Sequence, residues 1–302
     1  MSRPLWRAGR FEIDLGRPRV MGIVNATPDS FSEAEHDATP ARAIARCERL
    51  LSEGADILDI GGESSRPGAP PVGIDVELER VRPVLEAAVR LGCPVSIDTS
   101  KAGVMRVALD LGADIVNDIT ALRGAGSLEL AAVHGRCGIC LMHMRGTPAS
   151  MGAQARYEDV VAEIAAFLRE RADAAVTAGI ARERIVVDPG IGFAKTAAHN
   201  LELLARQEEL LALGLPLLVG WSRKSTLARL AGVAAPAPQR SAEERARIEA
   251  ASVAAALLAV ERGASVLRVH DVASTVAALA VWQAAGGVDN RGHRSSARTT
   301  PP

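Results

Sequence analysis

The chain alternates between short apolar runs and longer segments with helical periodicity, and this alternation constrains the fold more than any other feature of the sequence. Eight apolar runs have the length of strands and are rich in Val, Ile and Leu. Near-continuous apolar runs are typical of strands that are covered on both faces in a parallel sheet. The predicted strands are residues 19–25, 56–61, 94–98, 114–118, 138–143, 184–188, 216–220 and 265–270.

Helical segments separate these runs, and several of them end at a glycine just before the next strand, which is a common stop signal. The segments EGADILDIG, LGADIVNDI and RGASVLRVH share one order of helix end, Gly-Ala, strand and polar tip. Such an internal echo indicates repeated βα units, and eight units in about 270 residues predict an α/β fold of the (β/α)8 barrel type. The clearest predicted helices are residues 39–54, 75–92, 157–179, 199–214 and 241–263.

An open doubly wound sheet is the alternative fold. It is less favoured because no G-x-G-x-x-G follows the first strand and because polar tips follow nearly every strand. Residues 1–18 are predicted to form a short N-terminal β-hairpin region over the bottom of the barrel. We expect one domain over residues 1–286, and a disordered tail over 287–302, where no periodicity is present.

Composition and charge disfavour several classes of function. The net charge of −1 gives no general attraction to nucleic acid or to anionic membranes. Aromatic residues make up only 3% of the chain, which does not suit a surface that stacks single-stranded bases. The sequence shows no signal-like apolar segment and no apolar run free of charges that would span a membrane. We therefore expect a soluble cytoplasmic protein.

The segment HGRCGICLMH places His134, Cys137, Cys140 and His143 at steps of three, a spacing that superficially suggests zinc. However, CGICLM is predicted as a strand, in which residues three apart point to opposite faces. Cys137 and Cys140 are then unable to bind one ion together. We favour small buried side chains at both positions.

In a (β/α)8 barrel the reacting groups lie at the carboxyl ends of the strands. Asp98 and Asp188 end two of the predicted strands, and Asn117 precedes Asp118 at the end of a third. Carboxylate and amide groups suit a heterocycle with several N–H donors and acceptors. Asp59 lies inside the second strand, where a structural hydrogen-bonding role is favoured. His143 is equally well explained as a core histidine and is not included in the predicted site.

Cations are predicted nearer the rim of the same end. Arg268 and His270 are two residues apart on one strand, so both are expected to point into the barrel mouth, where they would suit a phosphate or diphosphate. Arg66 and Lys224 follow two other strands and add positive charge. The joint occurrence of these groups at most strand ends points to an active site more strongly than any single residue does.

Eight segments follow one another over roughly residues 19–284: MGIVNATPDSFS, DIGGESSRPGA, SIDTSK, DIVNDI, LMHMRGTP, DPGIGFAKT, GWSRKS and LRVHDV. In order and spacing they resemble the motifs of the dihydropteroate synthase family. That resemblance implies condensation of 6-hydroxymethyl-7,8-dihydropterin pyrophosphate with p-aminobenzoate, with release of pyrophosphate, and it implies Mg²⁺ as cofactor and a homodimer.

The resemblance also implies roles for individual residues. The implied catalytic residues are Asp98, Lys224, Arg66 and Asp188. The implied pterin-binding residues are Asp98, Asn117, Asp188, Lys224 and Met142. Diphosphate is expected at Asn25, Ser65, Arg66, Arg268 and His270, with Asn25 also bound to Mg²⁺. The p-aminobenzoate pocket, at which sulfonamides compete, is expected at Phe31, Pro67, Phe193, Ser222 and Lys224.

Some positions depart from the family pattern. After PDSFS the family usually continues with Asp and paired glycines, whereas this chain reads EAEHDATP, which bears on closure of the first loop. Ser65 stands where Thr is commoner, and Arg145 stands where Gln is usual. Two other functions stay open: a pterin-binding barrel without synthase activity, and a methyltransferase domain acting on a reduced folate. The methyltransferase domain should lack ESSRPG and the pair Arg268 and His270.

Overall fold

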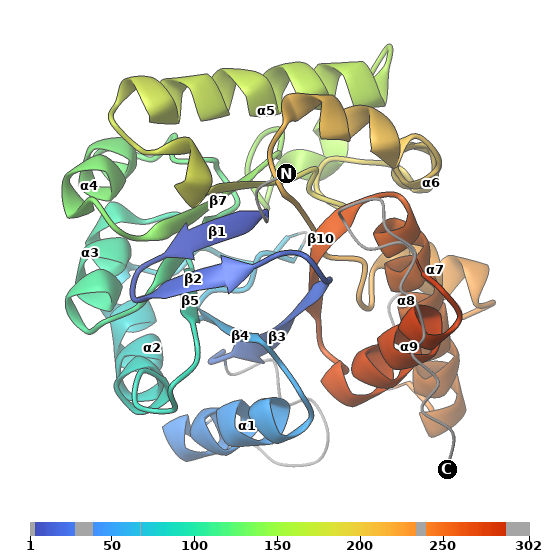
Figure 1. The fold of residues 1–302 in the computed structure, drawn as a ribbon, viewed down its shortest axis with the longest axis horizontal. Helices are drawn as coiled ribbons and strands as arrows, with labels where there is room; N and C mark the ends of the chain where they lie inside the picture. Colours follow the sequence, from blue (N-terminus) through green and yellow to red (C-terminus); the bar gives the residue numbers. More distant parts are fainter. Residues whose placement is uncertain (1–3, 28–38, 67, 234–239, 288–302) are drawn as a thin grey trace.

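Eight parallel strands close into a barrel, which confirms the predicted fold class (Figure 1). The structure is a computed structural model that describes residues 4–27, 39–66, 68–233 and 240–287. Around the ring the strands follow the order β10, β3, β4, β5, β6, β7, β8, β9. Their bounds are β3 Arg19–Asn25, β4 Ile57–Gly61, β5 Val95–Asp98, β6 Ile115–Asp118, β7 Gly138–Met142, β8 Ile185–Asp188, β9 Leu217–Val219 and β10 Ala264–Val269.

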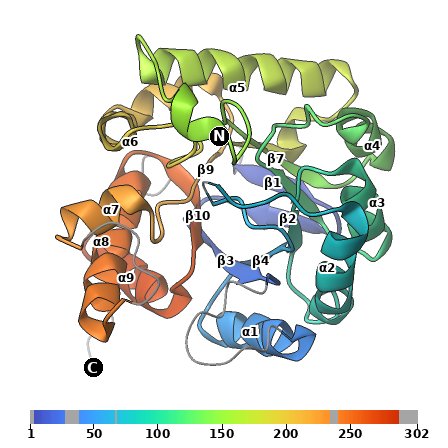
Figure 2. The same ribbon diagram turned by 180° about the vertical axis from the view of Figure 1, so that it is seen from behind.

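The helices form an outer layer around the barrel (Figures 1 and 2). Their starts follow simple chemistry: Asp159 accepts backbone N–H groups at the start of α5, and Ser241 with Glu244 forms a capping box at the start of α8. The α-helices are α1 Pro40–Ser52, α2 Ile74–Ala88, α3 Ala102–Asp110, α4 Ser127–His134, α5 Val160–Thr177, α6 Ala197–Ala205, α7 Ser225–Leu230, α8 Ala242–Glu261 and α9 Val272–Ala284.

Within the described residues the chain also forms three short 3-10 helices: η2 Met151–Gln154, η3 Arg182–Arg184 and η4 Gln207–Leu213. The single helix predicted over 199–214 is wrong, because the segment is divided into α6 and η4 at Arg206. Buried Gln207 donates to the backbone carbonyls of Ala259 and Arg262, at the end of α8. A tertiary contact thus accompanies the break, and helical periodicity does not reveal it.

The interior of the barrel is arranged in layers that follow from strand alternation. Seven strands supply the apolar layer at the amino end of the barrel: Met21, Ile57, Ile115, Cys140, Val186, Leu218 and Val266. Successive side chains of a strand alternate between the two faces, so the residue two positions later also points inward, closer to the mouth. Those residues are Ile23, Asp59, Asn117, Met142, Asp188, Gly220 and Arg268. Four of these seven residues are polar or charged, namely Asp59, Asn117, Asp188 and Arg268, so polar groups enter the interior within one step along the strands.

The N-terminal hairpin closes the amino end of the barrel, as predicted. Strands β1 Leu5–Ala8 and β2 Phe11–Asp14 pair antiparallel and cross the centre of the ring in Figure 1. The side chains of Trp6, Ile13 and Leu15 are buried in the same cluster as the apolar layer. Trp6 also donates its Nε1–H to the carbonyl oxygen of Arg184, at 2.9 Å. Hydrophobic contact thus fixes the hairpin, and one buried hydrogen bond sets its orientation.

Cys137 and Cys140 lie on opposite faces of the chain, which confirms the expected geometry. Cys140 belongs to the interior layer, whereas Cys137 is buried between the barrel and the helices. Over the described ranges, no helix combines the length and the apolarity needed to cross a bilayer. Of the tail predicted as disordered, 287–302, all but Gly287 lies outside the described residues.

Candidate active site

The floor of the barrel mouth is formed by two acids and one arginine: fully buried Asp59, and Asp98 and Arg268, which are partly exposed. Arg268 donates from Nε to Asp59 Oδ2 at 2.6 Å and from Nη2 to Asp98 Oδ2 at 2.5 Å. Asn117 donates from Nδ2 to the same Asp59 oxygen at 3.3 Å. Asp59 therefore has the structural hydrogen-bonding role that its position indicates. It also joins three predicted site residues, Asp98, Asn117 and Arg268, into one network.

Two strand-end carboxylates at the barrel mouth, Asp98 and Asp188, are held in an environment that disfavours their negative charge. Burial raises the pKa of Asp98 to about 7, although the positive charge of Arg268 acts in the opposite direction. Burial also raises the pKa of Asp188 to about 6, against a hydrogen bond of 2.6 Å from the Gly190 backbone N–H. Both acids therefore titrate close to neutral pH, where a small change in their surroundings changes their charge.

Lys224 and Phe193 form one wall of the mouth. The Lys224 Nζ lies 4.3 Å from the centroid of the Phe193 ring, a cation–π distance. Burial, followed by the charge of Arg268, lowers the pKa of Lys224 to about 8. Gly192 has φ of +82°, and a Cβ there would lie 3.0 Å from Lys224 Cδ, so glycine leaves room for the lysine. Phe193 also shares an apolar cluster with Met142.

Lys195 holds the loop that carries Phe193. Its Nζ donates to the carbonyl oxygens of Gly190 and Phe193, each at 2.9 Å, and contacts His143 Nδ1 at 3.0 Å. These three acceptors match the three N–H groups of an ammonium. Burial lowers the pKa of Lys195 to about 7, while Asp188 acts in the opposite direction. Lys195 is not among the residues predicted from the sequence, although its place in the loop after the strand-end aspartate Asp188 is a signal that could have indicated it.

His143 supports this loop through its ring, and its backbone N–H donates to the carbonyl oxygen of Asp188 at 2.9 Å. Burial, together with the charge of Lys195, lowers the pKa of His143 to about 2, so the imidazole is neutral. Neutral Nδ1 then accepts from Lys195. The ring also makes an edge contact with Phe167 on α5, with centroids 4.8 Å apart. His143 is therefore a buried positioning histidine, consistent with its omission from the predicted site.

A cationic region borders the ends of β3, β9 and β10. His270 lies 3.0 Å from Ser222 Oγ through its Nδ1 and donates its backbone N–H to the same oxygen. Arg46, on α1, donates to the backbone carbonyls of Ile23 at 2.9 Å and His270 at 2.8 Å. Burial and the cations Arg223, Arg268 and Arg46 hold the pKa of His270 well below its usual range. The mid-helix position of Arg46 gave no sequence signal of this placement.

The loop after β4 contributes a cation that is free of the floor. Arg66 is exposed and forms no ion pair within the described part of the chain. The loop is tied to its neighbour by a hydrogen bond of 3.2 Å from the Gly68 N–H to the Pro148 carbonyl. Half-buried Ser65 precedes Arg66. Phe31, Pro67 and the altered first loop (33–38) lie outside the described residues.

Asn25 ends β3 at the same mouth, in register with Gly61 of β4. It is half-buried, and its amide makes no hydrogen bond within the described residues. Those residues also contain no group of three or more His, Cys, Asp or Glu side chains placed to hold a metal. Mg²⁺ is commonly held by one or two protein oxygens together with substrate phosphates. A single amide oxygen at the mouth therefore fits an Mg²⁺ that arrives with a diphosphate.

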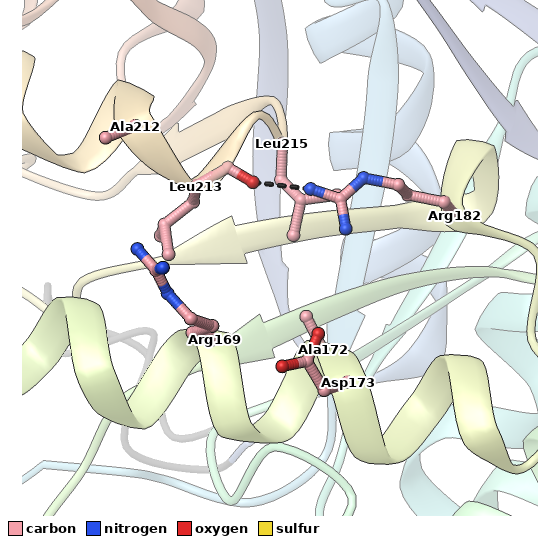
Figure 3. Close-up of a pocket in the computed structure, with 7 residues that line it drawn as sticks. All are labelled: Arg169, Ala172, Asp173, Arg182, Ala212, Leu213 and Leu215. Atoms are coloured by element: carbon pink, nitrogen blue, oxygen red, sulfur yellow. Dashed lines mark hydrogen bonds between the residues drawn. The ribbon is translucent and has the colours of Figure 1, made fainter.

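A hollow on the outer surface is unrelated to this site. It lies between α5 and the segment that leads into β9, and Arg182 bridges it by donating to the Leu213 carbonyl at 2.5 Å (Figure 3). None of the predicted site residues lines it. In contrast, the barrel mouth brings together Asn25, Asp98, Asn117, Met142, Asp188, Phe193, Ser222, Lys224, Arg268 and His270.

Comparisons with known proteins agree with this architecture. The family model for pterin binding enzymes matches residues 21–270. The dihydropteroate synthase of Neisseria meningitidis serogroup B is 49% identical over 291 residues, which cover 95% of this chain and 99% of that protein.

Two solved structures are similar in fold as well as in sequence. Xanthomonas albilineans dihydropteroate synthase with 4-aminobenzoic acid is 47% identical, with a TM-score of 0.85 over 94% of this chain and 98% of that chain. Yersinia pestis dihydropteroate synthase in a sulfonamide drug complex is 42% identical, with a TM-score of 0.85 over 93% of this chain and 98% of that chain. Because the family match and these identities extend over most of the chain, it belongs to the dihydropteroate synthase family of pterin binding enzymes.

Proposed function

We propose that this chain condenses 6-hydroxymethyl-7,8-dihydropterin pyrophosphate with p-aminobenzoate, giving 7,8-dihydropteroate and pyrophosphate for folate biosynthesis. The observation that carries the proposal is the single network in which Arg268 joins Asp59 and Asp98, beside a region rich in cations around His270. One substrate with a donor-rich ring and a diphosphate would satisfy both parts. Membership of the dihydropteroate synthase family supports the same reaction.

The pterin ring would lie on the polar layer of the barrel. Asp98 and Asp188 offer acceptor oxygens, and Asn117 offers both a donor and an acceptor, which suits the N–H and ring-nitrogen pattern of a pterin. Met142 flanks the position from the neighbouring strand. As pyrophosphate leaves, positive charge develops on the pterin methylene and ring. An anionic Asp98 stabilises that charge, which is why its protonation state matters.

The diphosphate would lie toward the ends of β3, β4 and β10. Arg268 uses Nε and Nη2 for the floor acids, which leaves further N–H groups of its guanidinium for the leaving group. His270, Arg66 and Ser65 add donors or positive charge from β10 and from the loop after β4. When it is bound at Asn25 with the diphosphate, Mg²⁺ supplies positive charge to the leaving oxygens. These groups bind the negative charge that the diphosphate already carries in the substrate, and they also stabilise the charge that is added as the bond breaks.

p-Aminobenzoate would bind against Phe193, with its carboxylate toward Lys224 and Ser222. The ring of Phe193 gives an apolar face, and the Lys224 Nζ above it gives a cation for the carboxylate. The amine then faces the pterin methylene and attacks it after pyrophosphate begins to leave. Sulfonamides are expected to compete for this pocket, and the Yersinia pestis structure with a sulfonamide drug supports that part of the proposal.

The direct test is an assay of the purified protein with both substrates and Mg²⁺. We expect 7,8-dihydropteroate and pyrophosphate to appear in equal amounts, and neither product to appear without p-aminobenzoate. Pterin binding without turnover would instead support a binding protein, and methyl transfer from a reduced folate would support the methyltransferase alternative. The presence of Arg66, Lys224, Arg268 and His270 together favours the synthase.

The proposal includes Mg²⁺ dependence and a homodimer located in the cytoplasm, as the family resemblance implies. Light scattering of the purified protein measures the mass in solution, where about twice the chain mass of 31.6 kDa is expected. Fractionation of cells that express the protein tests the location.

A further inference from the structure

Three charged residues form a cluster at the stem of the loop after β4, which we name the stem clamp: Glu63, Glu77 and Lys101. Lys101 Nζ lies 2.7 Å from Glu63 Oε2 and 2.5 Å from Glu77 Oε2. Glu63 follows β4, Glu77 lies in α2, and Lys101 lies between β5 and α3. The clamp therefore joins three consecutive parts of the barrel, and the reaction proposed above uses none of its members.

Glu63 also closes the loop on itself. Its second oxygen, Oε1, accepts the backbone N–H of Val72 at 2.9 Å, so one side chain joins the two ends of the segment 63–72. In Figure 2 the light-blue loop between β4 and α2 crosses the end of the barrel opposite the hairpin. Ser65 and Arg66 lie inside the closed segment. Their position therefore depends on where Glu63 is held.

Lys101 holds Glu63 because Glu77 gives the lysine a fixed place. The Glu77 side chain is 0% exposed, so its charge requires a close cation. Burial disfavours the charge of Lys101, but the hydrogen bonds to Glu63 and Glu77 outweigh burial and raise its pKa. Buried Glu77 thus holds the Lys101 ammonium in place, and the same ammonium also donates to Glu63 in the loop.

The backbone beside the clamp is packed too closely to move independently. A Cβ on Gly62 would lie 2.6 Å from Val81 Cγ1 and 3.0 Å from Glu77 Cγ, so the stem of the loop lies directly against α2. One residue earlier, Gly61 is in register with Asp98 on the adjacent strand. Lys101 follows Asp98 by three residues, and its backbone N–H contacts Thr99 Oγ1 at 3.3 Å. The clamp and the floor acid are therefore parts of one short region.

We propose that Glu63, Glu77 and Lys101 are positioning residues that fix the Arg66 loop relative to Asp98. The residues that bind the diphosphate and those that bind the pterin ring can then hold the two ends of one substrate molecule. This inference rests on the proposed synthase function. It assigns the clamp to binding of the diphosphate-bearing substrate, because Ser65 and Arg66 are the groups whose position it sets. p-Aminobenzoate, which would lie against Phe193 on another loop, should be affected less.

The decisive variant is Glu63→Gln, because it removes the charge on the loop side and leaves the buried pair of Lys101 and Glu77 intact. We expect KM for the pterin pyrophosphate to rise about tenfold, with kcat changed less than about twofold. Calorimetry should show a similar loss of affinity for inorganic pyrophosphate in the presence of Mg²⁺. Hydrogen exchange at the Val72 amide should become faster, since its acceptor is weakened. Lys101→Arg, which keeps the charge, should retain most of the affinity.

Asp56→Asn is the matched control. Asp56 Oδ2 accepts the Val20 N–H at 2.9 Å, and Asp56 Oδ1 pairs with Arg19 Nη1 at 2.9 Å, just before β4 begins at the far end of the barrel. Its side chain is 14% exposed, against 22% for Glu63, so both variants remove a similar carboxylate. The control should leave both KM values unchanged.

Two results would overturn the inference: wild-type pyrophosphate affinity and KM in Glu63→Gln, or an equal rise of KM in Asp56→Asn. Failure of the synthase proposal looks different, because the wild-type protein would then make no dihydropteroate. In that case the exchange rate of the Val72 amide and the affinity for pyrophosphate still decide whether the clamp positions an anion-binding loop.

Discussion

Arg268 Nε lies 2.6 Å from Asp59 Oδ2, so the predicted anion-binding arginine and the acids of the barrel floor belong to one ion-pair network. The Asp59 side chain is fully buried, and its Oδ1 has no hydrogen-bond partner among the residues that the structure describes. A buried carboxylate of this kind depends on its arginine. The arginine in turn is held at the floor by two acids, Asp59 and Asp98.

Asp59→Ala is expected to lower the free energy of unfolding by about 3–5 kcal/mol, because it leaves Arg268 without its fully buried partner. Urea denaturation of the purified variant measures this loss. Asp59→Asn should lose less, since an amide oxygen still accepts from Arg268 and from Asn117. Equal stability of Asp59→Ala and the wild type would show that Asp98 alone is sufficient to hold the arginine.

The layered interior of the barrel was open to prediction from sequence, whereas the side-chain pairing inside it was not. Strand alternation is a backbone property, so the inward direction of Asn117, Asp188 and Arg268 follows from the strand pattern. Sequence alternation does not fix where a long side chain ends. Arg268 was therefore predicted to face a diphosphate, yet the structure places two of its donors on the floor acids.

Arg46 and Lys195 were missed for a related reason. Each acts on backbone carbonyls of other segments, and such contacts depend on how loops and helices meet. Arg46 is an ordinary residue of an amphipathic helix until the ends of β3 and β10 are placed beside it. The motifs predicted the residues at the strand ends well, because the position of a residue along its strand is enough to place it at the mouth of the barrel.

Turnover is expected to rise between about pH 6 and 8, because Asp98 acts as an anion and burial raises its pKa to about 7. The effect is measured by the pH dependence of kcat at saturating concentrations of both substrates and of kcat/KM at limiting concentrations. Asp98→Asn should be slow at every pH and should lack the rise. A wild-type profile that is flat from pH 6 to 8 would mean that Asp98 does not titrate in this range.

Stability should show the opposite trend. The ordinary pKa of an aspartate is 3.8, and the pKa of Asp98 in the folded protein is about 7. The folded protein therefore binds the Asp98 proton more tightly than the unfolded chain does. The stabilisation by protonation is complete below about pH 4 and is lost as pH rises through about 7. Asp98→Asn cannot titrate, so its Tm should rise relative to the wild type between pH 5 and 8. A difference independent of pH would contradict the raised pKa.

Phe193→Leu is expected to raise KM for p-aminobenzoate about two- to fivefold, because it removes the ring that lies 4.3 Å from Lys224 Nζ. Steady-state kinetics with saturating pterin substrate measures the change. KM for the pterin pyrophosphate should stay the same, which serves as the internal control. If both KM values rise together, the ring acts on the whole site and not on this pocket.

Removal of Mg²⁺ by a chelator is expected to abolish the gain in Tm that pyrophosphate gives to the protein. The Tm without pyrophosphate should not change, since within the described residues no cluster of three or more metal-ligating side chains holds an ion. Asn25→Ala should reduce the pyrophosphate-dependent gain without altering the Tm of the free protein. A free-protein Tm that falls on chelation would point to a structural metal instead.

Trp6 tests whether the N-terminal hairpin serves stability alone. The indole is 0% exposed and packs with Leu15 at the amino end of the barrel, and its N–H donates to the Arg184 carbonyl. Trp6→Ala should therefore lower the free energy of unfolding by about 3–5 kcal/mol through the cavity that it leaves. Trp6→Phe should cost less, because it keeps the apolar contact and mainly leaves the Arg184 carbonyl without its donor.

The floor acids lie one layer closer to the mouth, so KM for both substrates should equal the wild-type values in whatever fraction of each variant is folded. A selective rise in KM for the pterin substrate in Trp6→Phe would show that the hairpin also sets the position of the floor.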